Sequence, residues 1–333
     1  KIDGANGEVY YSFDDTNNKI RYIVLDVYEN GPNSEAFVSK GQVKWFYDKL
    51  KEVKDYKVVV FTHAPVNSKI ASDGSKNILF IQEIEEAYNN GKKSVIKITN
   101  NSSMTFDFTN NTNLILAHFS GHTHRDRSSF DNNVLSITTT SDYYVTKLDN
   151  YMWERTKGTT SEQAFDVVTI DTNSNKIYAK RVGAGKDREW NFPTKDLSKC
   201  TMSEITTAYY QDKGTTLNLT ILDGNKKLVK NTDYTETYKN NQAEGVATIT
   251  IKGKGTYKGT ITKNFRIIKK ANIDTNKEYY ITSGIVSGRA IDGSNKKGAN
   301  ATSQTLSCGD SQRFKFIKNS DGSYYIQNVK TKY

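Results

Sequence analysis

The segment Leu114–Asp126, LILAHFSGHTHRD, constrains the fold of this chain more than any other. Residues 114–119 are mostly apolar and are followed by a serine and a glycine, which predicts a buried strand ending in a turn. Glycine relieves the steric limits on that turn, so the imidazoles of His122 and His124 can point at neighbouring positions. Such a pair suits a metal site, and the carboxyl end of a buried strand is where open α/β sheets gather ligands.

The other histidines strengthen this interpretation. The chain has 4 histidines in 333 residues, and His118, His122 and His124 lie close together. The fourth, His63, follows a second apolar strand predicted at 57–62. Two strands that each end in histidine predict one shared metal site formed by His63, His122 and His124. An H-x-H motif alone is more often a surface or packing feature, and we expect His118, inside its strand, to be packed or hydrogen-bonded.

Composition excludes several classes of protein. A mean hydropathy of -0.70, with no apolar run near the roughly 20 residues that span a bilayer, predicts no transmembrane segment. The first residues also lack the apolar core of a signal peptide. The two cysteines, Cys200 and Cys308, are too few for a disulfide scaffold or a cysteine-based metal site.

Charge is unevenly distributed along the chain. Residues 1–194 contain 24 Lys and Arg against 25 Asp and Glu, whereas residues 195–333 contain 23 against 12. The basic second half favours attraction to an anionic envelope polymer or acidic glycan, not steering of substrate to the histidines. Its lysines form no tight cluster, so we expect no specific nucleic-acid binding.

Periodicity predicts an α/β region followed by β structure. In the first part we expect strands at 20–27, 57–62 and 114–119, helices after a capping box at 39–42 and at 78–88, a hairpin at 95–108, and a return sheet at 134–137, 165–170 and 176–182. From residue 201 onward only short alternating strands appear, at 217–221, 234–238, 246–251, 260–267, 279–281, 289–292, 312–316 and 324–326. These strands predict a small β-sandwich and a further all-β module.

Residues 1–193 resemble the C-terminal part of a calcineurin-like metallophosphoesterase domain. The resemblance depends on the order of IRYIVLDV, VVVFTHAP and LILAHFSGHTH. It implies an α/β fold, an incomplete four-layer αββα sandwich, with two divalent or trivalent metal ions (Mn, Fe or Zn) that hydrolyse phosphate esters. His63 and His122 would serve one metal and His124 the other.

The family's D-x-H, GDxxD and GNH motifs do not occur in this sequence. They supply the bridging aspartate, an asparagine and the general-acid histidine, which we expect upstream of Lys1. We therefore expect this chain to carry half of the site, to bind metal weakly and to be inactive alone. Asp126, beside the histidine motif, has no counterpart in the ligand set, and we expect a solvated or structural carboxylate.

The second half resembles two accessory modules. Residues 194–270 are similar to a bacterial Ig-like repeat, a β-sandwich, and residues 271–333 to a partial ricin-type β-trefoil lectin module with Gln312-Arg-Phe in place of Q-x-W. That resemblance implies sugar binding by Asp292 with Gln312 assisting. The usual aromatic platform between them is missing, since residues 301–306 read ATSQTL.

Together these features predict a secreted bacterial or cell-surface metallophosphoesterase that acts on a phosphate ester. Its basic C-terminal half would hold it near an envelope polysaccharide or another anionic polymer. The alternative is a non-catalytic surface or glycan-binding protein with a degenerate phosphoesterase scaffold. The family's histidines do not distinguish among phosphoesters, so the sequence leaves the substrate open.

Overall fold

The computed structural model describes residues 2–4, 9–30, 35–53, 55–70, 73–142, 153–269, 272–293, 296 and 300–333. The chain divides into two compact units, Lys1–Ile267 and Ile268–Tyr333. Strands in several separate sheets make up most of the regular structure. The domain boundaries after residues 193 and 270 stay predictions. Among the residues that the structure describes, no helix has both the length and the apolar character needed to cross a bilayer.

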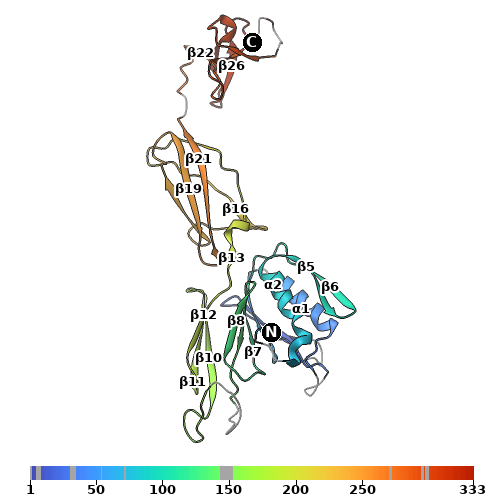
Figure 1. The fold of residues 1–333 in the computed structure, drawn as a ribbon. Helices are drawn as coiled ribbons and strands as arrows, with labels where there is room; N and C mark the ends of the chain where they lie inside the picture. The colour runs from blue at the N-terminus through green and yellow to red at the C-terminus, as the bar shows by residue number, and fades with distance from the viewer. Residues whose placement is uncertain are drawn as a thin grey trace. The chain divides into compact units, whose positions relative to one another are not determined.

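A seven-stranded sheet organises the part of the first unit before residue 194 (Figure 1). The inner strands β3, β4, β7 and β9 run parallel, and antiparallel strands flank them on both sides. In sheet order the strands are β1 (Ile2–Gly4), β2 (Tyr11–Asp15), β3 (Ile20–Val24), β4 (Lys57–Phe61), β7 (Ile115–Ser120), β9 (Val134–Thr138) and β8 (Arg127–Asp131). Parallel pairing brings the carboxyl ends of β3, β4 and β7 to one edge.

Two helices cover one face of this sheet, as the periodicity predicts. They are α1 (Lys40–Glu52) and α2 (Phe80–Asn89), accompanied by the hairpin β5 (Lys93–Thr99) and β6 (Ser102–Asp107) and by a short 3-10 helix, η1 (Asp73–Ile78). The Ser39 hydroxyl accepts a hydrogen bond from the Gln42 backbone N–H, which confirms an N-cap at Ser39. The reciprocal bond of the predicted capping box does not form, because the Ser39 N–H donates to Glu29 and the Gln42 amide bonds the Asp26 backbone. Phe46 and Leu50 of α1 pack with Val58 and Val60 of β4 in the larger apolar core.

A small antiparallel sheet lies on the opposite face. It consists of β10 (Ala164–Asp171), β11 (Lys176–Gly183) and β12 (Arg188–Asn191), and the turn between β10 and β11 confirms the predicted hairpin. Ile177 and Phe192 pack against Val59 and Phe119 of the large sheet in a second core. The described residues therefore place helices on one face of the large sheet and a second sheet on the other.

The rest of the first unit is all β and encloses its own core, which includes Ile249, Ile251 and Phe265. Its strands are β13 (Lys195–Asp196), β14 (Thr201–Met202), β15 (Thr207–Tyr209), β16 (Ile221–Asp223), β17 (Lys226–Lys227), β18 (Tyr234–Lys239), β19 (Gly245–Gly253), β20 (Tyr257–Lys258) and β21 (Thr260–Ile268), with a 3-10 turn, η2 (Leu197–Lys199). The strand predicted at 217–221 is largely wrong, because the Leu217 N–H donates to the Tyr238 hydroxyl instead of joining a ladder.

The second unit is also all β but has a very small core. Its elements are β22 (Glu278–Tyr280), β23 (Arg289–Asp292), β24 (Thr302–Thr305), η3 (Asp310–Gln312), β25 (Arg313–Lys318) and β26 (Tyr324–Asn328). Within its described residues only Ala290 and Phe314 are buried apolar side chains. So small a core provides little hydrophobic stabilisation for an independent domain.

Candidate metal centre

Two strand ends bring the candidate histidines together at one edge of the large sheet. His63 lies two residues after β4, and His122 lies two residues after β7. The backbone pairing continues beyond the strands, because the Thr62 N–H donates to the Phe119 carbonyl and the Gly121 N–H donates to the His63 carbonyl. This pairing places the GHTH loop beside His63.

The imidazoles of His63 and His122 meet there. His63 Nε2 lies 3.3 Å from His122 Nδ1, and the two rings are nearly perpendicular with centroids 5.2 Å apart. Two nitrogens that each bond one tetrahedral zinc ion at about 2.05 Å lie about 3.3 Å apart. The separation therefore fits two ligands of a single metal as well as it fits a hydrogen bond between the rings.

Both imidazoles favour the neutral form, which is the form that binds metal. Partial desolvation lowers the pKa of His63, although the residue as a whole is exposed, and the nearby His124 lowers it further. Desolvation also lowers the pKa of His122, with smaller contributions from His63 and His124. His124 therefore interacts electrostatically with both imidazoles.

The backbone of the GHTH loop is held in an unusual conformation. His122 has φ 55° and His124 has φ 53°, in the left-handed region that residues other than glycine seldom adopt. Such strain persists only where surrounding contacts enforce it, and it concentrates at functional sites. Here the His124 carbonyl accepts a hydrogen bond from the Thr140 hydroxyl, and the Thr140 N–H donates to Asp126.

Asp126 is a structural carboxylate, one of the two roles that the sequence predicts for it. Its side chain is 2% exposed and accepts hydrogen bonds from Arg181 at 2.8 Å and from the Trp153 indole at 2.6 Å. Burial raises its pKa, but the hydrogen bonds from Arg181 and Trp153 lower it more, so the net pKa is below its ordinary value. Arg181 also bonds Asp166, which ties the small sheet to the chain just after the histidine motif.

Tyr28 also belongs to this site, and sequence reasoning did not find it. It lies four residues after β3, at the same edge of the sheet, and its hydroxyl is 3.4 Å from His122 Nδ1. Its ring packs edge-on against His63 with centroids 5.7 Å apart. Tyr28 follows β3, which pairs in parallel with β4. The carboxyl ends of parallel strands share an edge, so this position could have identified Tyr28 from the sequence.

His118 is buried and hydrogen-bonded, as predicted. Its ring nitrogens lie 2.7 Å from Glu85 and 2.7 Å from Thr62, and the side chain is 1% exposed. Neither Glu85 nor Thr62 was identified from the sequence, because nothing in the local pattern distinguishes a helix glutamate that faces inward.

His63 and His122 provide only part of the ligands that one metal ion needs. Within the ranges that the structure describes, no group of three or more His, Cys, Asp or Glu side chains is arranged to hold a metal ion. His63 and His122 supply two nitrogen donors with a suitable separation. A zinc site normally takes three or four protein ligands, so these residues fit one side of a metal ion and do not by themselves form a dinuclear centre.

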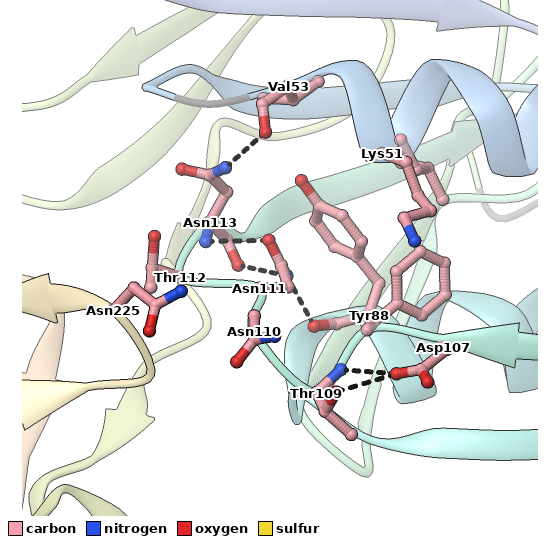
Figure 2. Close-up of a pocket in the computed structure, with 12 residues that line it drawn as sticks. Lys51, Val53, Tyr88, Asp107, Thr109, Asn110, Asn111, Thr112, Asn113 and Asn225 are labelled. Atoms are coloured by element: carbon pink, nitrogen blue, oxygen red, sulfur yellow. Dashed lines mark hydrogen bonds between the residues drawn. The ribbon is translucent and has the colours of Figure 1, made fainter.

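A pocket of about 550 Å³ lies at the opposite edge, where β4 and β7 begin (Figure 2). Asn113 donates to the Val53 carbonyl and Asn111 donates to the Tyr88 carbonyl, so these amides hold backbone in place. Burial raises the pKa of Tyr88 above its ordinary value. The pocket lining contains no histidine, and none of the predicted metal ligands faces it.

The predicted sugar-binding residues lie in the second unit. Gln312 is buried, with its Oε1 accepting from the Ser307 N–H and its Nε2 donating to the Thr305 carbonyl. Asp292 is half-buried and accepts a hydrogen bond from the Ser311 hydroxyl. Gln312 therefore fixes a loop of this unit, and the sugar-binding roles of both residues stay predictions.

Comparison with known proteins does not assign this chain to a family. No protein-family model matches the sequence, and no curated protein matches it.

Proposed function

We propose that this chain carries part of a metal-dependent phosphoesterase of the calcineurin-like class, within a four-layer αββα sandwich. The observation that carries the proposal is the 3.3 Å separation of His63 Nε2 and His122 Nδ1 at the carboxyl edge of a parallel sheet. The strained GHTH backbone and the lowered pKa values of both imidazoles support it.

In this proposal His63 and His122 hold one metal ion and His124 contributes to a second. When bound, two such ions (Mn, Fe or Zn) would supply charge stabilisation for the phosphoryl oxygens and hydroxide near neutral pH. The remaining ligands and the general acid belong to motifs that this sequence does not contain. The chain alone would bind metal weakly and turn over no phosphate ester.

Metal titration of the chain tests the proposal. We expect His63→Ala and His122→Ala each to weaken Zn²⁺ binding by more than about 100-fold, since loss of an outer partner alone costs 10–100-fold. His124→Ala is the matched control, because it should leave binding at the first metal largely intact. Isothermal titration calorimetry on metal-free protein measures all three.

Equal Zn²⁺ binding by the wild type and by all three variants would contradict the metal centre. Measurable hydrolysis of a phosphomonoester by residues 1–333 would contradict the separate claim that the chain is inactive alone. The accessory regions belong to the same proposal: an Ig-like spacer at 194–270 and a partial lectin-like module at 271–333 in a secreted bacterial protein.

A second candidate function is glycan binding without catalysis. The basic excess in residues 195–333 favours it, as does the finding that the described residues provide no third metal ligand beside His63 and His122. Binding to an insoluble anionic polysaccharide that persists in EDTA and disappears at high salt would support this function. Binding that requires metal would count against it.

A further inference from the structure

A chain of buried polar groups lies directly behind His63. His118, on β7, has Nδ1 2.7 Å from Glu85 Oε1 and Nε2 2.7 Å from the Thr62 hydroxyl. That hydroxyl in turn donates to the Ala64 carbonyl at 2.7 Å. Glu85, His118, Thr62 and Ala64 are all more than nine-tenths buried.

The directions of these hydrogen bonds follow from the number of available protons. The Thr62 hydroxyl has one hydrogen, which it donates to Ala64, so it accepts from His118 Nε2–H. One proton then remains between His118 Nδ1 and Glu85, and the pair has no net charge whichever atom carries it. Donation therefore has a fixed direction only from His118 onward, through the Thr62 hydroxyl to the backbone carbonyl of Ala64.

This series of hydrogen bonds ends at the two residues that flank His63, the candidate metal ligand. Thr62 precedes His63 and Ala64 follows it, so the bond between them closes the backbone around His63. The His63 carbonyl accepts from the Gly121 N–H, which fixes the same residue to the GHTH loop. Movement of Thr62 would therefore change the direction of the His63 imidazole relative to His122.

Stability alone does not account for this arrangement. Burying a glutamate and a histidine is costly, and well-packed apolar residues in place of a buried pair are often neutral or stabilising. In addition, the second carboxylate oxygen of Glu85 is buried without a hydrogen-bond partner within the described residues. Buried polar groups such as Glu85 and His118 are explained if their hydrogen bonds fix a backbone geometry that apolar packing would not specify.

We propose that Glu85, His118 and Thr62 are positioning residues that hold the His63 imidazole toward His122. The inference rests on the proposed metal centre, because it assigns these residues a role in presenting one of its ligands. None of the three is assigned as a metal ligand or as a group that contacts the substrate. They act through the backbone of residues 62–64.

Substitutions at Thr62 test the proposal in the full chain. Thr62→Val keeps the shape and removes the hydroxyl, whereas Thr62→Ser keeps the hydroxyl. We expect Thr62→Val to weaken Zn²⁺ binding by about tenfold, at the lower end for outer partners of metal ligands. Thr62→Ser should restore affinity to within about twofold of the wild type.

Asn89→Ala is the matched control. Asn89 lies one turn after Glu85 on the same helix and bonds the backbone of Ile115 at the other end of β7. We expect this variant to lower the melting temperature without changing Zn²⁺ affinity. A purely structural role for Thr62 would make Thr62→Val behave like Asn89→Ala, and that result would overturn the proposal.

A readout without metal separates this inference from the proposed function. The 4 histidines make imidazole ¹H–¹⁵N spectra of the metal-free chain simple to assign. We expect Thr62→Val to shift the signals of His118 and His63, and Asn89→Ala to leave His63 unchanged. Absence of Zn²⁺ binding by the wild-type protein would contradict the proposed metal centre. Unchanged His63 signals in Thr62→Val would separately contradict the positioning role of Glu85, His118 and Thr62.

Discussion

The two ends of strand β7 differ in the polar groups that hold them to α2. At the amino end, Asn89 uses its amide to bond the N–H and the carbonyl of Ile115. At the carboxyl end, Glu85 contacts the side chain of His118, and the contacts continue to Thr62. Both helix residues are fully buried, and they lie one turn apart.

Under the proposed function, this difference follows from the site at the carboxyl end of the strand. A neutral amide satisfies buried backbone groups at modest cost, which is all that fixing a strand requires. The carboxyl end instead contains costly ionisable groups, two left-handed histidines and the paired imidazoles. Strained backbone and perturbed ionisable groups each concentrate at functional sites.

The largest expected effect concerns the buried charges beside the GHTH loop. Asp126→Asn keeps the shape of the side chain but removes the charge that pairs with Arg181, each 2% exposed. Breaking a buried pair costs about 3–5 kcal/mol, and we expect the lower end because Asp166 still contacts Arg181. The 3 tryptophans all precede residue 193, so urea unfolding followed by tryptophan fluorescence reports on this region.

Lys180→Ala provides the control for that measurement. Lys180 pairs with Asp187 on the same small sheet, but both side chains are largely exposed. Its removal should change the free energy of unfolding by less than about 1 kcal/mol. Equal losses of unfolding free energy in Asp126→Asn and Lys180→Ala would mean that the buried ion pair stabilises the fold no more than the exposed pair.

A smaller effect is expected at the amino end of β7. Asn89→Ala leaves the buried N–H and carbonyl of Ile115 without their partners, which should cost about 1–3 kcal/mol of unfolding free energy. The same urea measurement checks it. The comparison between the two ends would lose its basis if Asn89→Ala also weakened Zn²⁺ binding as much as Thr62→Val.

The smallest expected effect is a dependence of stability on pH. The pKa values of His63 and His122 are lower in the folded chain than the value near 6.5 of an unperturbed histidine. As pH falls below about 6.5, the unfolded chain binds protons that the folded chain does not, so folding becomes less stable. Above that pH both imidazoles are neutral in the folded and in the unfolded chain, so they do not change the free energy of unfolding with pH.

Urea unfolding of metal-free protein between pH 7.5 and pH 5 measures this dependence. A variant with both His63→Ala and His122→Ala should lose less stability over the same range, because two of the responsible groups are gone. An identical loss in the variant would show that other groups cause the dependence. That result would also weaken the argument that the site favours neutral imidazoles.

Local sequence patterns predicted much of the first unit. The N-cap at Ser39, the alternation of apolar strands with amphipathic helices, and the hairpin of β10 and β11 depend on neighbouring residues. The second half of the predicted capping box failed, because the Gln42 side chain bonds the distant backbone of Asp26. The strand at 217–221 failed because a tertiary contact with Tyr238 replaced its ladder. The sugar-site prediction at Gln312 depended on resemblance alone, which did not reveal that its amide bonds the loop around it.

The sequence by itself determined that His63 and His122 end two apolar strands, because both the apolar runs and the scarcity of histidine are visible in the chain. Only the tertiary structure decided which groups surround them. Tyr28 lies 94 positions from His122, and His118 lies 56 positions from Thr62 and 33 from Glu85. Contacts over such separations arise from parallel strand pairing and from helix packing on the sheet, and no local pattern of residues specifies them.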